Sequence, residues 1–253
     1  MIGKEAGVVE HRRHKNAHTP RILIVQNHPV EGLDSIEAYL GEHKIAYTVY
    51  PAYRNEGSPP IQDYDAFIVG GTPTSLYDPD RPEFFRRETA LLARAVKVAK
   101  PCLGVCGGGQ LLANILGAEV RKNPVREIGI YKVTLTTAGR RSRFFEGFPS
   151  EFPVFQWHGD TFDTPKGCRL LVQGRDCANQ AFSYGNSLAL QFHLEVSSRT
   201  AAKWADEYQE ELEAFGKTKE EIVEKCKETE AKMRLLSDRL VANFLNGLQS
   251  LEE

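Results

Sequence analysis

The sequence lacks the long apolar run that a membrane span requires. No stretch approaches ~20 consecutive apolar residues, and residues 1–20 contain no apolar core of the signal-peptide kind. Neither sign of charge is in excess, because 32 basic residues stand against 34 acidic ones. This balance gives no electrostatic reason to expect nucleic acid or an anionic membrane as a partner. We therefore expect neither partner, and we expect a cytoplasmic protein.

Cysteines are few, and their spacing excludes two common uses. The sequence contains no Cys-x-x-Cys pair, and its five cysteines are Cys102, Cys106, Cys168, Cys177 and Cys226. An odd number in a chain of 253 residues argues against a disulfide framework. A reducing compartment follows, in which one reactive thiol can stand among inert ones. We expect no metal site and no cofactor.

The first 20 residues are polar and basic, which predicts a loose tail. Spaced histidines in this tail, His11, His14 and His18, raise the question of metal binding. They lie among arginines and lysines, with no acidic or thiol partner nearby. A solvated tail is therefore the better interpretation.

Short apolar runs alternate with helical segments from residue 21 onward. We expect strands at 21–27, 44–50, 65–71 and 101–105, and helices at 31–43, from Asp80 onward, and at 110–117. Such alternation predicts a parallel sheet that is covered on both faces. Residues 118–192 contain short runs separated by turn residues, which predicts antiparallel strands that extend the sheet.

The chain becomes helical again after Ser197. Gly216 interrupts this pattern, and Thr218 with Glu221 forms a capping box that begins a long last helix. Cys226 lies on the apolar stripe of that helix, so we interpret it as a core residue.

Three glycines directly follow Cys106 in the stretch GVCGGGQ, residues 104–110. A Walker loop is excluded because no Lys-Ser/Thr pair follows, and the spacing does not fit a dinucleotide-binding loop. A structural turn and a nucleophile elbow remain. In an elbow, a strand runs into the reactive residue and a helix starts at once, so a strained backbone presents the side chain outward. The helix amides would favour the thiolate, and that of Gly107 could hold an oxyanion.

A thiol nucleophile also needs a base and an orienting partner. His193 and Glu195 follow a short apolar strand that contains Leu188, Leu190 and Phe192. Side chains two residues apart on an extended backbone share a face, so Glu195 can orient the imidazole of His193. A His-x-Glu pair alone is at least as often structural. Its combination with an elbow favours catalysis.

These residues give the sequence a family likeness: it resembles the class I, or triad, glutamine amidotransferases. The family's marks are Gly-x-Cys-x-Gly-x-Gln, Phe-His-x-Glu and a glycine pair at a strand end. They are matched here by residues 104–110, by residues 192–195, and by Gly70 with Gly71. The stretches NHPVEG (27–32), GGTPTSLYD (70–78), REIGIYKV (126–133) and WHGDTF (157–162) resemble the stand-alone, GMP-synthase-like branch. The likeness covers about residues 21–200.

The resemblance implies a reaction and a role for each site residue. Cys106 would attack the side-chain amide carbon of glutamine, His193 would take the thiol proton, and Glu195 would orient His193. The amides of Gly71 and Gly107 would form the oxyanion hole, and Gln110 would contact the bound glutamine. His158 lies in a segment that faces the substrate in relatives, and it is a further substrate-binding candidate. The alternative for His158 is a strand end capped by Asp160.

Two features depart from the family pattern. The residue after the nucleophile is commonly larger than Gly107, so a less firmly fixed oxyanion hole is expected. The loop 70–78 is one residue longer than the usual Gly-Gly-Pro form, which leaves open which of its amides points inward.

Pattern and resemblance together predict an α/β fold of the flavodoxin-like three-layer sandwich type. Its central sheet would be mainly parallel, with an antiparallel extension and a C-terminal helical extension. We divide the chain into a loose tail at 1–20, a class I glutamine amidotransferase domain at 21–200, and a helical extension at 201–253 packed on that domain.

Three functions compete. The first is a glutaminase that releases glutamate and ammonia through a γ-glutamyl thioester on Cys106. The ATP-pyrophosphatase domain of GMP synthase does not fit within residues 200–253, so a separate synthase subunit would receive the ammonia. The second is a γ-glutamyl peptidase acting on glutathione-like compounds. The third is a non-catalytic binding module, against which the intact cysteine, histidine and glutamate argue.

Overall fold

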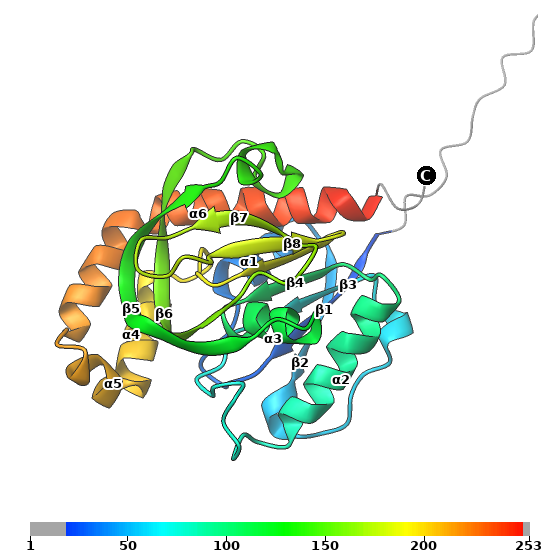
Figure 1. Ribbon diagram of the computed structural model, residues 1–253, viewed down its shortest axis with the longest axis horizontal. Coiled ribbons are helices and arrows are strands. Elements are labelled where there is room, and N and C mark those ends of the chain that lie inside the picture. Colours follow the sequence, from blue (N-terminus) through cyan, green and yellow to red (C-terminus); the bar gives the residue numbers. More distant parts are fainter. Residues whose placement is uncertain (1–18, 250–253) are drawn as a thin grey trace, which may run out of the picture.

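A computed structural model of the chain describes residues 19–249, which fold around one sheet (Figure 1). The tail histidines His11, His14 and His18 lie outside the described residues. The strands are β1 (Arg21–Gln26), β2 (Ala46–Pro51), β3 (Ala66–Val69), β4 (Cys102–Val105), β5 (Val120–Leu135), β6 (Glu151–Phe162), β7 (Arg169–Gln173), β8 (Ala181–Tyr184) and β9 (Ser187–Leu190). The helices are α1 (Asp34–Glu42), α2 (Phe84–Lys97), α3 (Gly107–Ile115), α4 (Ser198–Glu207), α5 (Gln209–Ala214) and α6 (Lys219–Gln249).

The sheet is mixed, in the order β2-β1-β3-β4-β9-β8-β7-β5-β6. Strands β2, β1, β3, β4 and β9 run parallel to their neighbours, as the alternation of strands and helices predicts. From β9 onward each pairing is antiparallel. The predicted parallel sheet with an antiparallel extension is therefore confirmed. Strand β9 joins the two parts, being parallel to β4 and antiparallel to β8.

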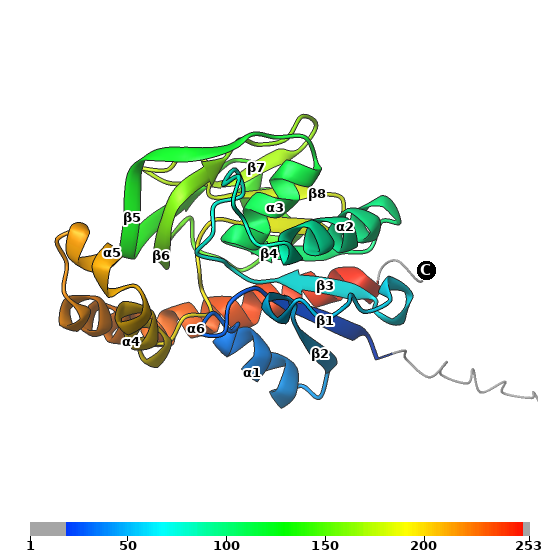
Figure 2. The ribbon, with the colours of Figure 1, turned by 90° about the horizontal axis from the view of Figure 1, so that it is seen from below.

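Helices cover both faces of the parallel part. Figure 2 shows α1 and α6 on one face and α2 and α3 on the other. The strands are apolar on both faces for this reason: Ile22 and Ile24 belong to the core under α1 and α6, whereas Leu23 and Val25 belong to the core under α2 and α3. Burial on both faces is the usual condition of parallel strands and explains their continuous apolar runs.

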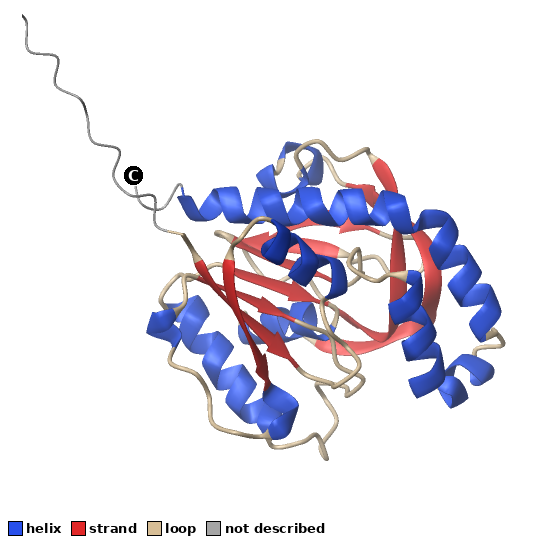
Figure 3. Cartoon of the chain, turned by 180° about the vertical axis from the view of Figure 1, so that it is seen from behind, coloured by secondary structure: helices blue, strands red, loops and turns tan. Residues whose placement is uncertain are grey.

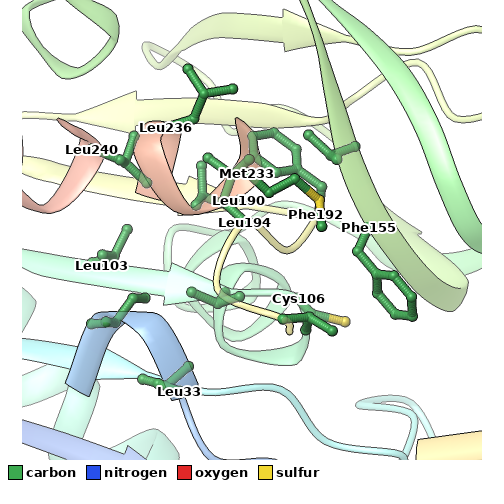
Figure 4. Close-up of a cluster of buried hydrophobic side chains, with 14 of the residues drawn as sticks. Leu33, Leu103, Cys106, Phe155, Leu190, Phe192, Leu194, Met233, Leu236 and Leu240 are labelled. Atoms are coloured by element: carbon green, nitrogen blue, oxygen red, sulfur yellow. The ribbon is translucent and has the colours of Figure 1, made fainter. Parts of the chain in front are cut away.

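The last helix runs along the sheet (Figure 3). Its predicted capping box is confirmed, since Thr218 N–H donates to Glu221 at 3.0 Å and Glu221 N–H donates to the Thr218 hydroxyl at 3.2 Å. Gly216 has a φ of 74°, and Cys226 is buried in the core. Figure 4 shows apolar side chains of α6 beside those at and after the end of β9, namely Met233, Leu236 and Leu240 beside Leu190, Phe192 and Leu194. Within residues 19–249, no helix has the length and apolar character needed to cross a membrane.

Three predicted helix starts were wrong by a few residues. Helix α1 begins at Asp34 instead of Glu31, because the Glu31 N–H closes a turn onto the His28 carbonyl and the Leu33 N–H donates to the Glu37 side chain. Helix α2 begins at Phe84 instead of near Asp80, whose N–H closes a turn onto the Asp78 carboxylate. Helix α3 begins at residue 107, three residues earlier than the stretch 110–117.

Candidate active site

Cys106 lies between β4 and α3 with backbone angles φ 52° and ψ -111°. A positive φ in a residue with a side chain is strained, as the elbow interpretation requires. Glycines allow the turn to pack closely against neighbouring strands. A Cβ added at Gly108 would lie 2.2 Å from the Val69 carbonyl oxygen, and one at Gly109 would lie 2.3 Å from that of Leu190. Strands β3 and β9 therefore leave room only for glycine after the cysteine.

His193 is held by its side chain and by its backbone. Its Nδ1 lies 2.6 Å from Oε1 of Glu195, and both side chains are buried. Its backbone N–H and carbonyl both hydrogen-bond to Phe155 at 2.9 Å, which fixes the residue beyond the end of β9. The Trp204 ring stands edge-on to the imidazole, with centroids 5.0 Å apart. These contacts leave the ring little freedom to turn.

The other ring nitrogen of His193, Nε2, is buried and has no hydrogen-bond partner among the described residues. Cys106 is its neighbour: a Cβ added at Gly71 would lie 3.6 Å from Cβ of Cys106 and 3.7 Å from Cε1 of His193. Burial alone would lower the pKa of His193, but the Glu195 carboxylate and the Cys106 sulfur outweigh burial and raise this pKa well above its ordinary value. The Glu195 carboxylate and the Cys106 sulfur therefore favour the imidazolium form of His193. We call Cys106, His193 and Glu195 the Cys106 group.

A pocket opens over Cys106 and His193. Its walls come from the loop 70–78, from β6 and from the helices α4 and α5. Sequence reasoning did not identify six of its lining residues: Glu31, Arg126, Trp157, Trp204, Tyr208 and Glu211. Three of the stretches that carry the family likeness contained a signal for them, because NHPVEG includes Glu31, REIGIYKV includes Arg126 and WHGDTF includes Trp157. The residues of α4 and α5 carried no local signal, since only folding brings them to the pocket.

The C-terminal helices contribute polar groups to this pocket. Tyr208 donates a 2.6 Å hydrogen bond to Oε1 of Glu31, and burial raises the pKa of that carboxyl. Glu211 forms an ion pair with Arg126, and it also accepts a 3.3 Å hydrogen bond from the indole of Trp157. Helix α5 is thereby fastened to β5 and β6 across one side of the pocket.

The two proposed oxyanion donors, the N–H groups of Gly71 and Gly107, have no hydrogen-bond partner among residues 19–249. Both belong to segments in close contact. A Cβ added at Gly107 would lie 2.5 Å from Cγ2 of Thr72 and 3.0 Å from its backbone nitrogen. The longer 70–78 loop thus occupies the space of a larger side chain after Cys106. Contact with this loop restricts Gly107, whose intrinsic freedom would otherwise loosen the turn.

Gln110 lines the pocket, and its amide nitrogen donates at 3.3 Å to the Asp160 carbonyl oxygen and to the Gln191 side chain. Gln191 was not identified from the sequence. Its amide nitrogen lies 3.9 Å from the sulfur of Cys106, so it can donate a weak hydrogen bond to a thiolate. Both glutamines are buried, and they fix the polar surroundings of the sulfur.

The side chain of Asp160 fastens the 70–78 loop to β6. It accepts hydrogen bonds from the Ser75 hydroxyl at 2.6 Å and from the Tyr77 hydroxyl at 2.7 Å. The second half of the loop that carries Gly71 is therefore tied to β6 beside the pocket.

A second buried set of the same residue types lies beside the pocket, and we call Glu127, His158 and Cys177 the Cys177 group. Their ligand atoms all lie within 4.8 Å of one another, which suits a metal ion. The atoms also satisfy one another without an ion. His158 Nε2 lies 2.9 Å from Oε2 of Glu127, and its Nδ1 lies 2.8 Å from the Asp160 carbonyl oxygen.

Both nitrogens of the His158 ring are thus engaged by protein oxygens, and its side chain is 2% exposed. This geometry favours the structural alternative for the His158 side chain over substrate binding. The partner of the ring is Glu127 on the neighbouring strand, and Asp160 contributes only its backbone carbonyl.

Comparison with known proteins gives concordant results. A family model described as glutamine amidotransferase class-I matches residues 32–207. The glutamine amidotransferase-like protein YfeJ of Salmonella typhimurium is 34% identical over 196 residues, which are 74% of this chain and 82% of that protein. The glutamine-hydrolyzing GMP synthase of Thermomicrobium roseum is 34% identical over 131 residues, 51% of this chain and 23% of that protein. The crystal structure of a glutamine amidotransferase from Thermotoga maritima superposes with a TM-score of 0.84 at 30% identity, covering 90% of this chain and 99% of that one.

Proposed function

The chain belongs to the class I glutamine amidotransferase family, and we propose that it hydrolyses the side-chain amide of glutamine through a thioester on Cys106. The overall reaction converts glutamine and water to glutamate and ammonia. The sulfur forms a bond to the amide carbon, the carbon–nitrogen bond breaks, and water then releases the acyl group from the sulfur.

His193 transfers the protons in this scheme. Its open Nε2 takes the proton of the Cys106 thiol and, as an imidazolium, delivers it to the departing ammonia. In the second half it accepts a proton from the attacking water and returns one to the sulfur. Glu195 holds Nδ1, so the same ring face stays toward Cys106 throughout, and its charge stabilises the imidazolium.

Charge that develops on the carbonyl oxygen needs donors that are already in place. The N–H groups of Gly71 and Gly107 are proposed for this role. Neither has a hydrogen-bond partner among residues 19–249. Gly107 begins α3, where the helix dipole adds to its effect, and Gly71 approaches Cys106 from the loop after β3.

The open nitrogen of His193 is the observation that carries the proposal. A buried ring nitrogen without a hydrogen-bond partner lowers the stability of the fold, and a catalytic role explains why such an atom is kept. Here it faces a cysteine with a strained backbone at the base of a pocket.

The test is glutamate release from glutamine by the intact chain and by Cys106→Ala. We expect the variant to lose activity by about 10⁴-fold or more, and a γ-glutamyl adduct to appear on the Cys106 peptide of the wild type in acid-quenched mass spectrometry. Cys168→Ala is the matched control, because this half-buried cysteine does not line the pocket. Unchanged hydrolysis by Cys106→Ala would remove the assignment of the nucleophile.

A kinetic panel of glutamine against γ-glutamyl peptides separates the glutaminase from a γ-glutamyl peptidase. The contacts of Ser75 and Tyr77 with Asp160 hold the 70–78 loop to β6, and this favours the small leaving group of glutamine. Preference for the peptides would reverse that assignment, and no labelling of Cys106 by a glutamine-like chloroketone would favour a non-catalytic module. The names of the GMP synthase relatives suggest a separate synthase subunit as the acceptor of the ammonia.

A further inference from the structure

Two buried polar side chains near the pocket have no part in the proposed reaction. Asn27 follows β1 and is 3% exposed, and Glu88 on α2 is 1% exposed. The amide nitrogen of Asn27 donates to Oε1 of Glu88 at 2.8 Å and to the Gly70 carbonyl oxygen at 3.2 Å. A backbone carbonyl can only accept, so the nitrogen of the Asn27 amide must be the atom that faces Gly70.

The contact with Gly70 fixes more than one atom. In a trans peptide the carbonyl oxygen and the following N–H lie in one plane and point in opposite directions. The described peptide bonds include no cis form. Holding the Gly70 oxygen toward Asn27 therefore directs the Gly71 N–H away from Asn27. That N–H is one of the two donors proposed for the oxyanion hole.

The peptide between two glycines needs such a restraint. Glycine reaches backbone angles that other residues cannot, so this peptide can rotate at little steric cost. A half turn would place the Gly70 carbonyl oxygen where the N–H belongs, and the oxygen would repel a developing oxyanion. The Gly70 N–H is already fixed to Val25 at 3.0 Å, which leaves the orientation of the next peptide to Asn27.

We propose that Asn27, anchored by Glu88, is a positioning residue that orients the peptide between Gly70 and Gly71 with its N–H toward the reacting carbonyl. This inference rests on the proposed glutamine hydrolysis. Oδ1 of Asn27 and Oε2 of Glu88 have no partner among the described residues. Such atoms lower stability, so the pair is better explained by what it orients than by the stability it adds.

Burial supports a neutral Glu88. It raises the pKa of this carboxyl to about 8, with the Asn27 hydrogen bond opposing part of the shift. The carboxyl is therefore mostly protonated at neutral pH, and no carboxylate lies behind the Gly70 carbonyl. Glu88 then acts as an acceptor that holds the Asn27 amide in place.

Steady-state kinetics of Asn27→Ala test the proposal. We expect kcat for glutamine to fall about 10- to 100-fold, because one oxyanion donor loses its orientation, and KM to change by less than about twofold. Binding of glutamate γ-semialdehyde, whose thiol adduct also carries an oxygen in the hole, should weaken in proportion. Alkylation of Cys106 by iodoacetamide makes no oxyanion and should keep its rate.

Further variants separate orientation from folding. Asn27→Asp keeps the shape but removes the N–H donor, and it should lose activity like Asn27→Ala. Glu88→Gln keeps a neutral acceptor and should stay within about twofold of the wild type. Asn243→Ala is the control, since the Asn243 amide donates to the carbonyls of Phe144 and Glu146 at 3.1 Å away from the pocket. Its kcat and KM should not change.

A crystal structure of folded Asn27→Ala gives an outcome that does not depend on activity. A flipped or disordered peptide between Gly70 and Gly71 supports the proposal, whereas an unchanged peptide overturns it. Equal losses of kcat and of Cys106 alkylation would also overturn it, because they indicate general damage. Wild-type protein that hydrolyses no γ-glutamyl substrate contradicts the proposed function instead, and the crystal structure still decides the orientation.

Discussion

The Cys106 group and the Cys177 group contain the same three residue types, and both are buried. Their imidazole–carboxylate contacts are similar, at 2.6 Å and 2.9 Å. They differ in whether a nitrogen of the histidine ring remains without a hydrogen-bond partner. In the Cys106 group the carboxylate takes Nδ1 and Nε2 has no partner in the described chain. In the Cys177 group both nitrogens are engaged. Composition alone therefore does not identify a base; our proposal for His193 depends on its unoccupied nitrogen beside Cys106.

The two cysteines differ in the same sense. Cys106 has a strained backbone and lines the pocket. Cys177 is 0% exposed, and its sulfur lies 3.1 Å from the Thr161 hydroxyl. Burial raises the pKa of the Cys177 thiol to about 11, so it stays protonated at neutral pH. The comparison separates the group that we propose for proton transfer from one that ties together β5, β6 and the segment before β8.

Replacing each histidine by asparagine should give the largest difference in kcat between the two groups. His193→Asn removes the base, and we expect kcat to fall about 10³- to 10⁴-fold. His158→Asn should stay within about tenfold in kcat and lose about 1–3 kcal/mol of unfolding free energy, because it breaks buried hydrogen bonds. Glutamate release and urea unfolding measure the two quantities. Similar losses of kcat in both variants would erase the distinction.

Replacing each glutamate by glutamine should give a smaller difference in kcat. Glu195→Gln removes the charge that helps to raise the pKa of His193, so this pKa falls. We expect kcat to drop about 10²-fold and the alkaline limb of the rate profile to move to lower pH. Glu127→Gln should stay within about threefold, because an amide can still bond to His158. An unmoved alkaline limb in Glu195→Gln would argue against its role.

Glu88 offers a third buried carboxyl, without an imidazole beside it. Its pKa is raised from 4.5 to about 8, so the folded state prefers the acid form. This contribution to stability is fully present below pH 4.5 and is lost as pH rises through about 8. Relative to Glu88→Gln, the wild type should lose about 1.4 kcal/mol per pH unit across this window and no more above it. Parallel stability curves for the two proteins would contradict this.

Thiol labelling should give the smallest difference. At neutral pH, iodoacetamide should modify Cys106 at least about tenfold faster than Cys177 in the folded protein. Peptide mapping by mass spectrometry measures both rates in one sample. After unfolding in urea the two rates should converge, because both groups are lost. Faster labelling of Cys177 in the folded protein would reverse the comparison.

The sequence-based predictions were accurate where the residues involved are close together in the sequence, and they failed where the residues are far apart. The strand–helix turn at Cys106 was predictable because its strained angles depend on local glycines. The contact between His193 and Glu195 was predictable because an extended backbone brings alternate residues together. The hydrogen bond between Tyr208 and Glu31 was missed because it joins residues that are far apart in the sequence.

Interactions between distant segments were beyond prediction for the same reason. Glu127 faces His158 only because β5 and β6 pair in that register, with a bulge just before it. The glycine at position 107 departs from the family pattern, and packing explains it, because Thr72 leaves no space there for a larger side chain.

The sequence by itself determined the family, the alternation of strands and helices, and the elbow with its nearby His-x-Glu pair. These depend on residues close together in the chain, whose geometry the backbone dictates. Only the tertiary structure decided which histidine keeps an open nitrogen, how α4 and α5 complete the pocket, and that Asn27 meets Gly70. Those outcomes depend on which distant segments pack together, and burial then fixes each hydrogen bond, since an unpaired polar group in the core is costly.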